Sequence, residues 1–421
     1  MKQKINSVVV VVVLLFFMNV SAQEQQIKSL LSNIGLGTTF TEATIAERAQ
    51  GDLSVVGNNN YESVTFVNPA LLSDLQLTSF GGAFQVQSTK VNTQDLTFSN
   101  SSTTLSNIIF GVPLGMKGGF ALGLRVHSAI GFDVDSESFY NNGYGTVNHI
   151  YGGVGYQIFK NFSLGLQANV YFGGITKTQA FKNIQKSTVM EESYNVKGLS
   201  TKIGAQYKIK IYKRIIAQLG AYGVLGYNLS ASGNSKFYEA FESGNNNFYE
   251  NTNRTPIALT LSGIQKNEFK SVIGLGLGEV NRWFAGASYE SQGATTYSGN
   301  VFNQTYSTPL STSFEPFSKV SIGGYVIPKK YSIKKYLSRV VYRAGFKYEN
   351  TGTVLNNHTL KNIAMTFGLG LPIGKRVSYA NFAVEIGQLG ALSQNSYQEE
   401  YINLGVSFSL ADKWFEKRLI R

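Results

Sequence analysis

The chain has 421 residues, a formal net charge of +12 and no cysteine. The absence of cysteine excludes disulfides, thiolate catalysis and zinc–sulfur sites. Mean hydropathy is close to neutral, a value shared by soluble proteins and by membrane barrels, whose lipid-facing and lumen-facing residues alternate and cancel in an average.

The first residues have the organisation of a secretory signal peptide. Two lysines precede an apolar run at residues 8–18, and small residues follow up to Ala22. A membrane-spanning helix needs roughly 20 apolar residues, which is more than this run provides. We therefore predict that residues 1–22 are a signal peptide cleaved after Ala22. Loss of the two leader lysines lowers the formal charge to +10.

The remaining positive charge predicts attraction to anionic partners. For an exported chain we expect the lipid bilayer itself, through the phosphate-bearing head groups of outer-membrane lipids, and no nucleic acid. The alternative is a basic rim that is only solvated.

Residues 23–75 lack the alternation that marks the rest of the chain. Ile27, Leu30, Leu31 and Ile34 recur at helical spacing, which predicts a short amphipathic turn or two. Apolar residues continue through the segment, whereas disordered segments are poor in them. We predict that residues 23–75 fold into the lumen of a barrel as a plug, or hatch, with a disordered tail as the alternative.

Fourteen segments of alternating polarity follow in residues 77–410. In residues 161–173 the even-numbered positions are apolar and the odd-numbered ones mostly polar or glycine, and residues 217–229 alternate similarly. Alternation over ten or more residues predicts β-strands with one face towards lipid and the other towards a lumen. Strands of soluble β-sandwiches alternate too, but they are usually five or six residues long.

The connections between these segments alternate short and long, as in outer-membrane barrels with short periplasmic turns and longer external loops. The sequence therefore predicts an all-β fold, a transmembrane antiparallel β-barrel of about 14 strands over residues 76–410, in the outer membrane of a Gram-negative bacterium. Residues 411–421 are predicted to form a periplasmic C-terminal tail anchored at the interface by Trp414 and Phe415. The long loops are expected at 89–104, 132–145, 177–191, 230–269, 292–316, 350–359 and 390–397.

A series of motifs begins with FVNPALL at residues 66–72. The others lie at 111–115, 119–125, 342–351, 368–372, 385–390 and 414–418. In this order they resemble the FadL/TodX family of outer-membrane transporters for hydrophobic substrates, in particular its Bacteroidetes-type members. FVNPALL resembles the Asn-Pro-Ala element in the hatch of that family.

The resemblance implies a fourteen-stranded barrel closed by an amino-terminal hatch. It also implies passive uptake of hydrophobic or amphipathic molecules, such as long-chain fatty acids or aromatic compounds, with sideways exit through a wall gap near the third strand. In that strand, residues 123–128 lack the expected proline, a residue that marks a bulge in the ladder. The alternative function is a non-transporting barrel subunit of a larger outer-membrane assembly, with other outer-membrane proteins as partners.

A hinge is predicted at Asn68, Pro69 and Ala70, where the hatch meets the first strand. Proline fixes φ near −65° and donates no ladder hydrogen bond, and asparagine can hydrogen-bond the backbone two residues on. On the hinge hypothesis this turn lets the hatch shift when a ligand arrives. The alternative is an ordinary turn before a strand.

Charged and aromatic side chains on the predicted lumen face are candidates for ligand binding. A cation beside tyrosines suits an amphipathic acid, which needs an apolar tunnel and one charged anchor. The alternative is a hydrogen-bond network that holds the hatch. It would be formed by the lumen-facing charges Lys202, Arg343, Lys347, Glu349 and Glu385. The candidate residues are Arg125, His127, His149, Tyr151, Tyr171, Tyr222, Arg343 and Lys347.

The longest predicted loop, residues 230–269, is rich in aromatic residues. Such residues near the outer rim usually form a girdle at the lipid interface, and a hydrophobic capture groove is the functional alternative. The aromatic residues are Phe237, Tyr238, Phe241, Phe248 and Tyr249.

Enzymatic chemistry is not expected, and neither a cofactor nor a metal site is predicted. The three histidines lack metal-ligand spacing, and no Gly-x-Ser-x-Gly elbow is present. On the predicted alternation Ser128 points away from the face that carries His127, which prevents a Ser–His pair. The run GLGLG at 274–278 lacks the spacing of a nucleotide-binding loop and is predicted to be a barrel strand beside the plug.

Overall fold

The computed structural model describes residues 29–57, 65–94, 97–183, 186–212, 214–242, 248–251, 253–302, 312–373 and 378–412. The predicted signal peptide, Ile27, Trp414 and Phe415 lie outside these residues. Within the described ranges, no helix combines the length and apolar character needed to cross a membrane.

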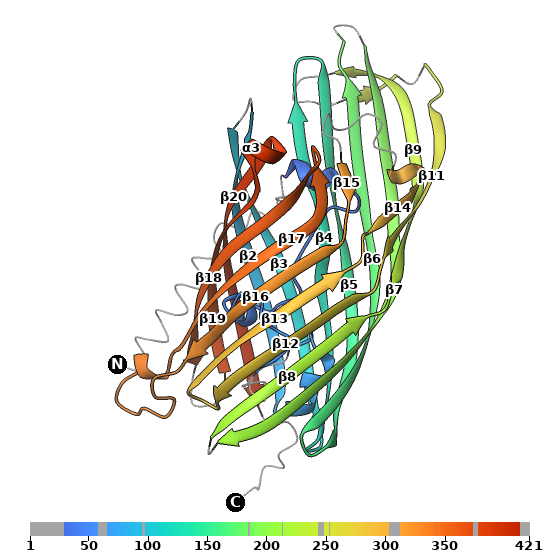
Figure 1. Cartoon of the computed structure of the whole chain (residues 1–421). Helices are drawn as coiled ribbons and strands as arrows, with labels where there is room; N and C mark the ends of the chain where they lie inside the picture. Colours follow the sequence, from blue (N-terminus) through green and yellow to red (C-terminus); the bar gives the residue numbers. More distant parts are fainter. Residues whose placement is uncertain are drawn as a thin grey trace, which may run out of the picture.

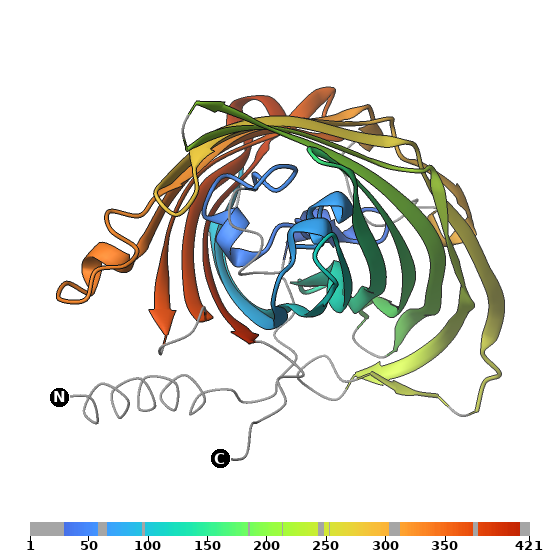
Figure 2. The same cartoon turned by 90° about the horizontal axis from the view of Figure 1, so that it is seen from below.

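The strands form one antiparallel sheet that closes on itself, because the first wall strand pairs with both the second and the last (Figures 1 and 2). Closure leaves no open edge on the first strand. Ten wall strands are continuous: β2 (Thr78–Thr93), β3 (Thr97–Leu114), β4 (Gly118–Asp135), β5 (Phe139–Phe159), β6 (Phe162–Phe181), β7 (Ser187–Tyr212), β17 (Val341–Leu355), β18 (His358–Ile373), β19 (Ser378–Ala391) and β20 (Tyr397–Asp412).

Four further wall strands are each interrupted once. Both halves of the first, for example, pair with β7. The halves are β8 (Ile215–Val224) and β9 (Tyr227–Glu242), β11 (Ile257–Asn267) and β12 (Lys270–Glu279), β13 (Trp283–Gln292) and β14 (Thr296–Gly299), and β15 (Thr312–Phe314) and β16 (Phe317–Val326). The wall therefore has fourteen strands, which confirms the predicted fold class.

The amino-terminal residues lie inside the barrel, where Figure 2 shows them within the ring of strands. Their helix α2 begins with a capping box, in which Thr44 and Glu47 satisfy each other's backbone N–H groups. The elements of this hatch are η1 (Leu30–Asn33), β1 (Thr38–Thr39), α2 (Ile45–Arg48) and η2 (Pro69–Asp74). The remaining short elements are β10 (Phe248–Glu250), η3 (Asn300–Phe302), η4 (Leu337–Arg339) and α3 (Leu392–Asn395).

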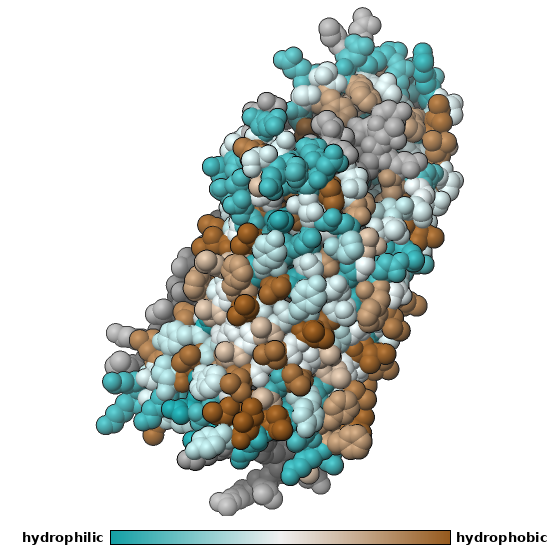
Figure 3. Space-filling model, viewed as in Figure 1, coloured by the Kyte–Doolittle hydropathy of each residue, from teal (hydrophilic) through white to brown (hydrophobic). Residues whose placement is uncertain are grey.

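The predicted alternation is visible in β6. Leu166 and Val170 are exposed on the outer face, whereas Gln167 and Asn169 between them are buried on the inner face. Apolar residues gather over the lower part of the face shown in Figure 3, and polar residues cover its upper end. This is the distribution expected where the lower part lies in lipid and the upper part in water.

Several strands are much longer than a bilayer requires. A spanning strand needs about 9–11 residues, but β5, β6 and β7 contain 21, 20 and 26. Together with β9 they rise above β2 and β18 in Figure 1 as an ordered extension, which we call the tower. The prediction of a long loop at 230–269 is therefore wrong, because β9, β10 and β11 occupy most of it.

The hatch meets the wall at glycines on eleven of the fourteen wall strands. A Cβ atom on Gly323 would overlap the backbone carbonyl of Gln50, and one on Gly165 would overlap the backbone of Pro69. Gly165 is paired directly with glycines of both neighbouring strands. This glycine belt consists of Gly119, Gly155, Gly165, Gly204, Gly220, Gly274, Gly286, Gly323, Gly345, Gly368 and Gly405.

We predict that Gly323→Ala loosens the seat of the hatch, because the added methyl group overlaps the Gln50 backbone. Overpacking of this kind costs about 1–3 kcal/mol. The matched control is Gly82→Ala, since a Cβ there meets no atom within 4 Å. The readout is the temperature at which the fast-migrating folded form disappears from SDS gels. Equal temperatures for both variants would show that the belt contact stabilises nothing.

Candidate functional site

A cavity of about 410 Å³ lies between the hatch and the barrel wall. Hatch residues from Gly37 to Ala43 line one side, and polar and aromatic side chains of the wall line the others. His149, Tyr151 and Arg343 are not part of the lining. Of the eight candidate ligand-binding residues, the cavity is lined by Arg125, His127, Tyr171, Tyr222 and Lys347.

An aromatic cluster on β4, β5 and β6 brings four of the candidates together. The ring of Tyr171 lies edge-on to His127 and His149, with centroid distances of 4.9 and 5.1 Å. Tyr151 is fully buried and stacks on Phe66 of the hatch at 4.7 Å. The cluster is therefore part of the contact between the hatch and the wall.

Arg125 also contacts the hatch from β4. Its Nη2 donates a hydrogen bond to the Phe40 carbonyl at 2.8 Å, whereas Nη1 is buried with no partner among the described residues. Lys202 and Tyr222 lie next to one another, since the Lys202 ammonium is 5.2 Å from the Tyr222 ring centroid. Arg125, Lys202 and Tyr222 thus surround the hatch side of the cavity.

The predicted alternation fails at one position of β4. The register with β5 shifts between Val126 and Ser128, which marks a β-bulge at His127. The prediction that Ser128 points away from the lumen is wrong, because the bulge turns it inward and its hydroxyl donates to the Leu36 carbonyl at 2.8 Å. The Ser128 hydroxyl proton is therefore used in a hydrogen bond to the hatch.

The same bulge lies beside an interruption of the wall. Pairing between β3 and β4 extends upward only to Asn107 and Arg125. Above this point β4 pairs with the hatch strand β1, at Thr38 and Thr39. The hatch thus supplies a short piece of sheet near the third strand, where the family resemblance implied a gap.

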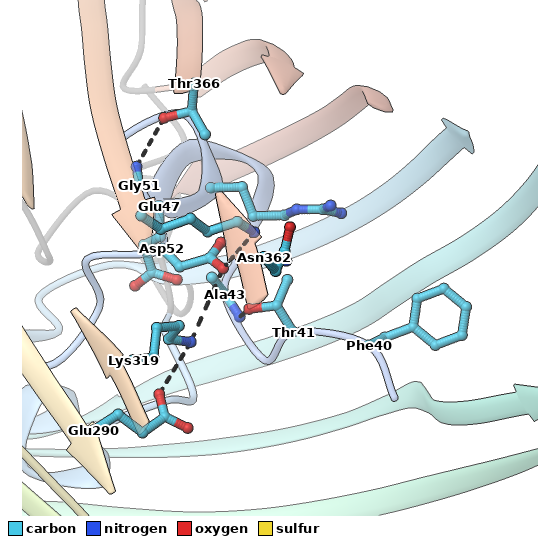
Figure 4. A network of polar contacts seen from close by, with 12 residues as sticks. Phe40, Thr41, Ala43, Glu47, Gly51, Asp52, Glu290, Lys319, Asn362 and Thr366 are labelled. Carbon is cyan, nitrogen blue, oxygen red and sulfur yellow. Dashed lines mark hydrogen bonds and ion pairs between the residues drawn. The ribbon is translucent and has the colours of Figure 1, made fainter. Parts of the chain in front are cut away.

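An ion network connects the hatch to the opposite wall (Figure 4). The carboxylate of Asp52 in the hatch lies 3.0 Å from Lys347 and 4.0 Å from Lys319. Lys347 is also 2.9 Å from Glu385, and Lys319 is 3.0 Å from Glu290. Burial alone would raise the pKa of Asp52, but the cations of Lys347, Lys319 and Arg48 hold it at about 2. Asp52 is therefore ionised at neutral pH.

Other hatch acids are paired in the same way. Glu42 pairs with Lys202, and Asp74 pairs with Lys208. Lys347, a predicted anchor for a substrate carboxylate, already contacts two carboxylates of the protein. The arrangement around it matches the alternative of a network that holds the hatch.

The Asn-Pro-Ala element is fixed on several sides. The buried Asn68 side chain accepts a hydrogen bond from Ala70 N at 3.1 Å and donates to the carbonyls of Val55 and Ala205 at 2.9 and 3.3 Å. Ala205 belongs to β7, so this residue links two hatch segments to the wall. Below it, the Ser73 and Ser163 hydroxyl oxygens are 2.8 Å apart. These contacts fix the turn both to the rest of the hatch and to the wall. Movement of the hatch at this turn stays a prediction.

The five aromatic residues of the predicted capture loop lie on β9 of the tower and on β10, which pairs with β9. Tyr238 and Phe248 pack against a small buried cluster of alanine and valine. Phe237 is half-buried, and Phe241 and Tyr249 are exposed. The placement of these residues on a loop is therefore wrong, although their role in capture is untested.

The main features that the sequence did not reveal are the glycine belt and the hatch acids. The only signal for the belt is the recurrence of glycine on inner faces, which also occurs in strands without a plug. Among the described residues, no group of three or more His, Asp or Glu side chains is arranged to hold a metal ion.

We predict that Asp52→Ala destabilises the protein, because Lys347 and Lys319 keep their buried charges but lose a partner. Removing one member of a buried ion pair costs about 3–5 kcal/mol. The free energy of unfolding from urea titration in lipid vesicles measures the effect. Glu137→Ala, at an exposed position between β4 and β5, is the control and should change it little. An Asp52→Ala variant as stable as this control would contradict the role of the network.

Comparisons with known proteins bear on the fold and on the family. The toluene transporter TbuX of Ralstonia pickettii superposes with a TM-score of 0.59 at 12% identity, covering 88% of this chain and 99% of its own. The toluene transporter TodX of Pseudomonas putida superposes with a TM-score of 0.59 at 16% identity, and the match covers 89% of this chain and 99% of TodX. A FadL homologue of Pseudomonas aeruginosa superposes with a TM-score of 0.58 at 13% identity, and the match covers 89% of this chain and 98% of the homologue.

At these identities the matches establish the fold, and they confirm the structural resemblance to FadL/TodX channels that the motifs predicted. Such barrels are outer-membrane proteins. A search of curated proteins found no match. The family model described as BamG matches residues 1–421.

Proposed function

The chain belongs to the BamG family, and from this premise we propose that it is a plugged barrel subunit of an outer-membrane assembly, the BAM complex, rather than a transporter. Its partners would be other outer-membrane proteins of that assembly. The observation that carries the proposal is the full-length family match. The contacts between the hatch and the wall, and the shape of the tower, support the proposal.

A transporter with a moving hatch must break and reform the contacts between hatch and wall. Here those contacts include the glycine belt, where hatch backbone lies against several of the wall glycines, and ion pairs at Glu42, Asp52 and Asp74, of which the Asp52 pair is buried. Opening would separate these charges from their partners, which is costly in a buried site. We therefore propose that Asn68 acts as a static pin and not as a hinge.

The tower supports the proposal in a different way. It extends paired strands beyond the membrane, for example by ladders between β7 and β9 from Ser187 to Gly198. Ordered strands present a fixed surface, and a fixed surface loses little entropy when another protein binds it. Transport alone requires no such extension.

A second candidate function is passage of small amphipathic molecules. The observations in its favour are the cavity and the interrupted pairing of β3 and β4 above Asn107 and Arg125. The cavity lining is mixed, however, and its charged residues include Asp52, Lys319 and Lys347, which are paired with one another, whereas sites for small molecules are mostly apolar.

A designed disulfide distinguishes the two functions. The Ser73 and Ser163 oxygens are 2.8 Å apart, so Ser73→Cys with Ser163→Cys should form a bond between hatch and wall in this cysteine-free chain. Locking the hatch should leave subunit function unchanged, measured as growth of a strain that depends on the variant. A loss of function under oxidising conditions that reductant restores, absent in each single variant, would contradict the static hatch.

Partner capture tests the proposal directly. A tagged chain extracted from its own envelope in mild detergent should bring down other outer-membrane proteins in fixed ratio, and the disulfide-locked variant should bring down the same set. Recovery of the chain alone, together with a bound apolar compound detected by mass spectrometry, would favour transport instead.

A further inference from the structure

The connection between β16 and β17 has an unusual composition. Residues 328–339 read PKKYSIKKYLSR, with five cationic residues and no acidic one. We call this segment the periplasmic arm, because it joins the lower ends of two wall strands, opposite the tower (Figure 1). The alternation of short and long connections predicts a short periplasmic connection here. A turn between antiparallel strands needs as few as two residues, so the length of the arm is not required by the barrel.

The arm exposes large apolar side chains at its tip. Ile333 is 99% exposed, Tyr331 is 77% exposed and Leu337 is 69% exposed. Isolated exposed apolar residues are ordinary, but several on one short segment mark an interaction site. The lysines at 334 and 335 directly follow Ile333, so the apolar tip is flanked by positive charge.

The arm is held in a defined conformation. Lys329 N donates to the Ser338 carbonyl at 2.7 Å and closes its base, where Ile327 and Val340 are buried. The Tyr336 hydroxyl donates to the Pro372 carbonyl of β18 at 3.1 Å. On the other side, Lys330 Nζ donates to the Asn281 side chain at 2.6 Å, and Asn281 Nδ2 donates to the Tyr331 hydroxyl at 3.5 Å. The exposed side chains of Ile333 and Leu337 remain available for another surface.

The direction of the arm indicates which surface that is. In Figures 1 and 2 the arm points sideways from the lower rim, away from the lumen. A segment that leaves the wall sideways at this rim runs along the periplasmic face of the bilayer. Neighbouring lower turns carry the exposed side chains of Arg214 and Arg282, which share one acidic partner, Glu279.

We propose that the periplasmic arm binds anionic phospholipid at the periplasmic surface of the outer membrane. Tyr331, Ile333 and Leu337 enter the boundary between head groups and acyl chains, as the apolar face of an interfacial segment does. Lys329, Lys334 and Lys335 extend their aliphatic stems along that boundary and place their ammonium groups at the phosphates. The arm thus fixes the depth of one side of the barrel. The proposal depends on the outer-membrane location and not on the identity of any partner protein.

A single cysteine makes the arm measurable, because the chain has none of its own. Ile333→Cys carrying a nitroxide label is reconstituted as the full chain in vesicles of phosphatidylcholine, with or without phosphatidylglycerol. Relaxation by oxygen reports burial in the bilayer, and relaxation by a water-soluble nickel chelate reports exposure to water. With phosphatidylglycerol the label should become accessible to oxygen and protected from the chelate.

Two comparisons identify the cause. Met116→Cys labels a lower turn between β3 and β4 at a position of similar exposure, 96% against 99% for Ile333. Only one lysine neighbours it in the sequence, and it should not respond to anionic lipid. Changing Lys329, Lys334 and Lys335 to Gln should weaken the response of the 333 label by about fivefold for each lysine. Leu337→Cys provides a second reporter if the first variant assembles poorly.

The proposal is overturned if the label at 333 stays accessible to the nickel chelate in anionic vesicles, as at position 116. It is also overturned if protection appears only when other envelope proteins are added, since the arm would then dock on a protein. Protection that the lysine substitutions leave unchanged would contradict the role of phosphate contacts.

Discussion

Two polypeptide backbones can lie against each other only where neither carries a side chain between them, and this constraint organises the whole molecule. The hatch passes so close to the wall that a methyl group on Gly323 or Gly165 would overlap its backbone. The belt of wall glycines therefore sets the level at which the hatch rests. Other contacts of the hatch are built around that level, including the Asn68 hydrogen bonds and the Asp52 ion pairs.

In this arrangement, separating the hatch from the wall costs a large amount of free energy. Backbone contact limits how far the hatch can move, and paired charges raise the cost of separation because each ion would lose its partner in a buried site. What remains open is a cavity of about 410 Å³, whose lining includes the ion pairs of Asp52 with Lys347 and Lys319. Such a barrel suits a role in which it binds other components through its outer surfaces. These surfaces are the tower above the membrane and the periplasmic arm below it.

The sequence predicted the parts of the fold that lipid dictates. Where a strand crosses the bilayer, as in β6, its outward-facing residues must be apolar. Apolar and polar residues then alternate, and this alternation makes the strand recognisable in the sequence. Beyond the lipid that requirement ends, which is why β9 to β11 were interpreted as a loop. Alternation also assumes an unbroken ladder, so the bulge at His127 reversed the predicted direction of Ser128. The pairing of Asp52 with Lys347 joins residues 295 positions apart, and no local pattern predicts such a contact.

A hatch seated in this way should be held as firmly as the wall. Amide hydrogen exchange of the full chain in lipid vesicles tests it, because exchange reports local opening. Gly51 N donates to the Thr366 hydroxyl at 2.9 Å, so peptides covering 45–57 should exchange as slowly as those from β17 and β18. Exchange of the hatch peptides within minutes, while the wall peptides stay protected, would contradict the account.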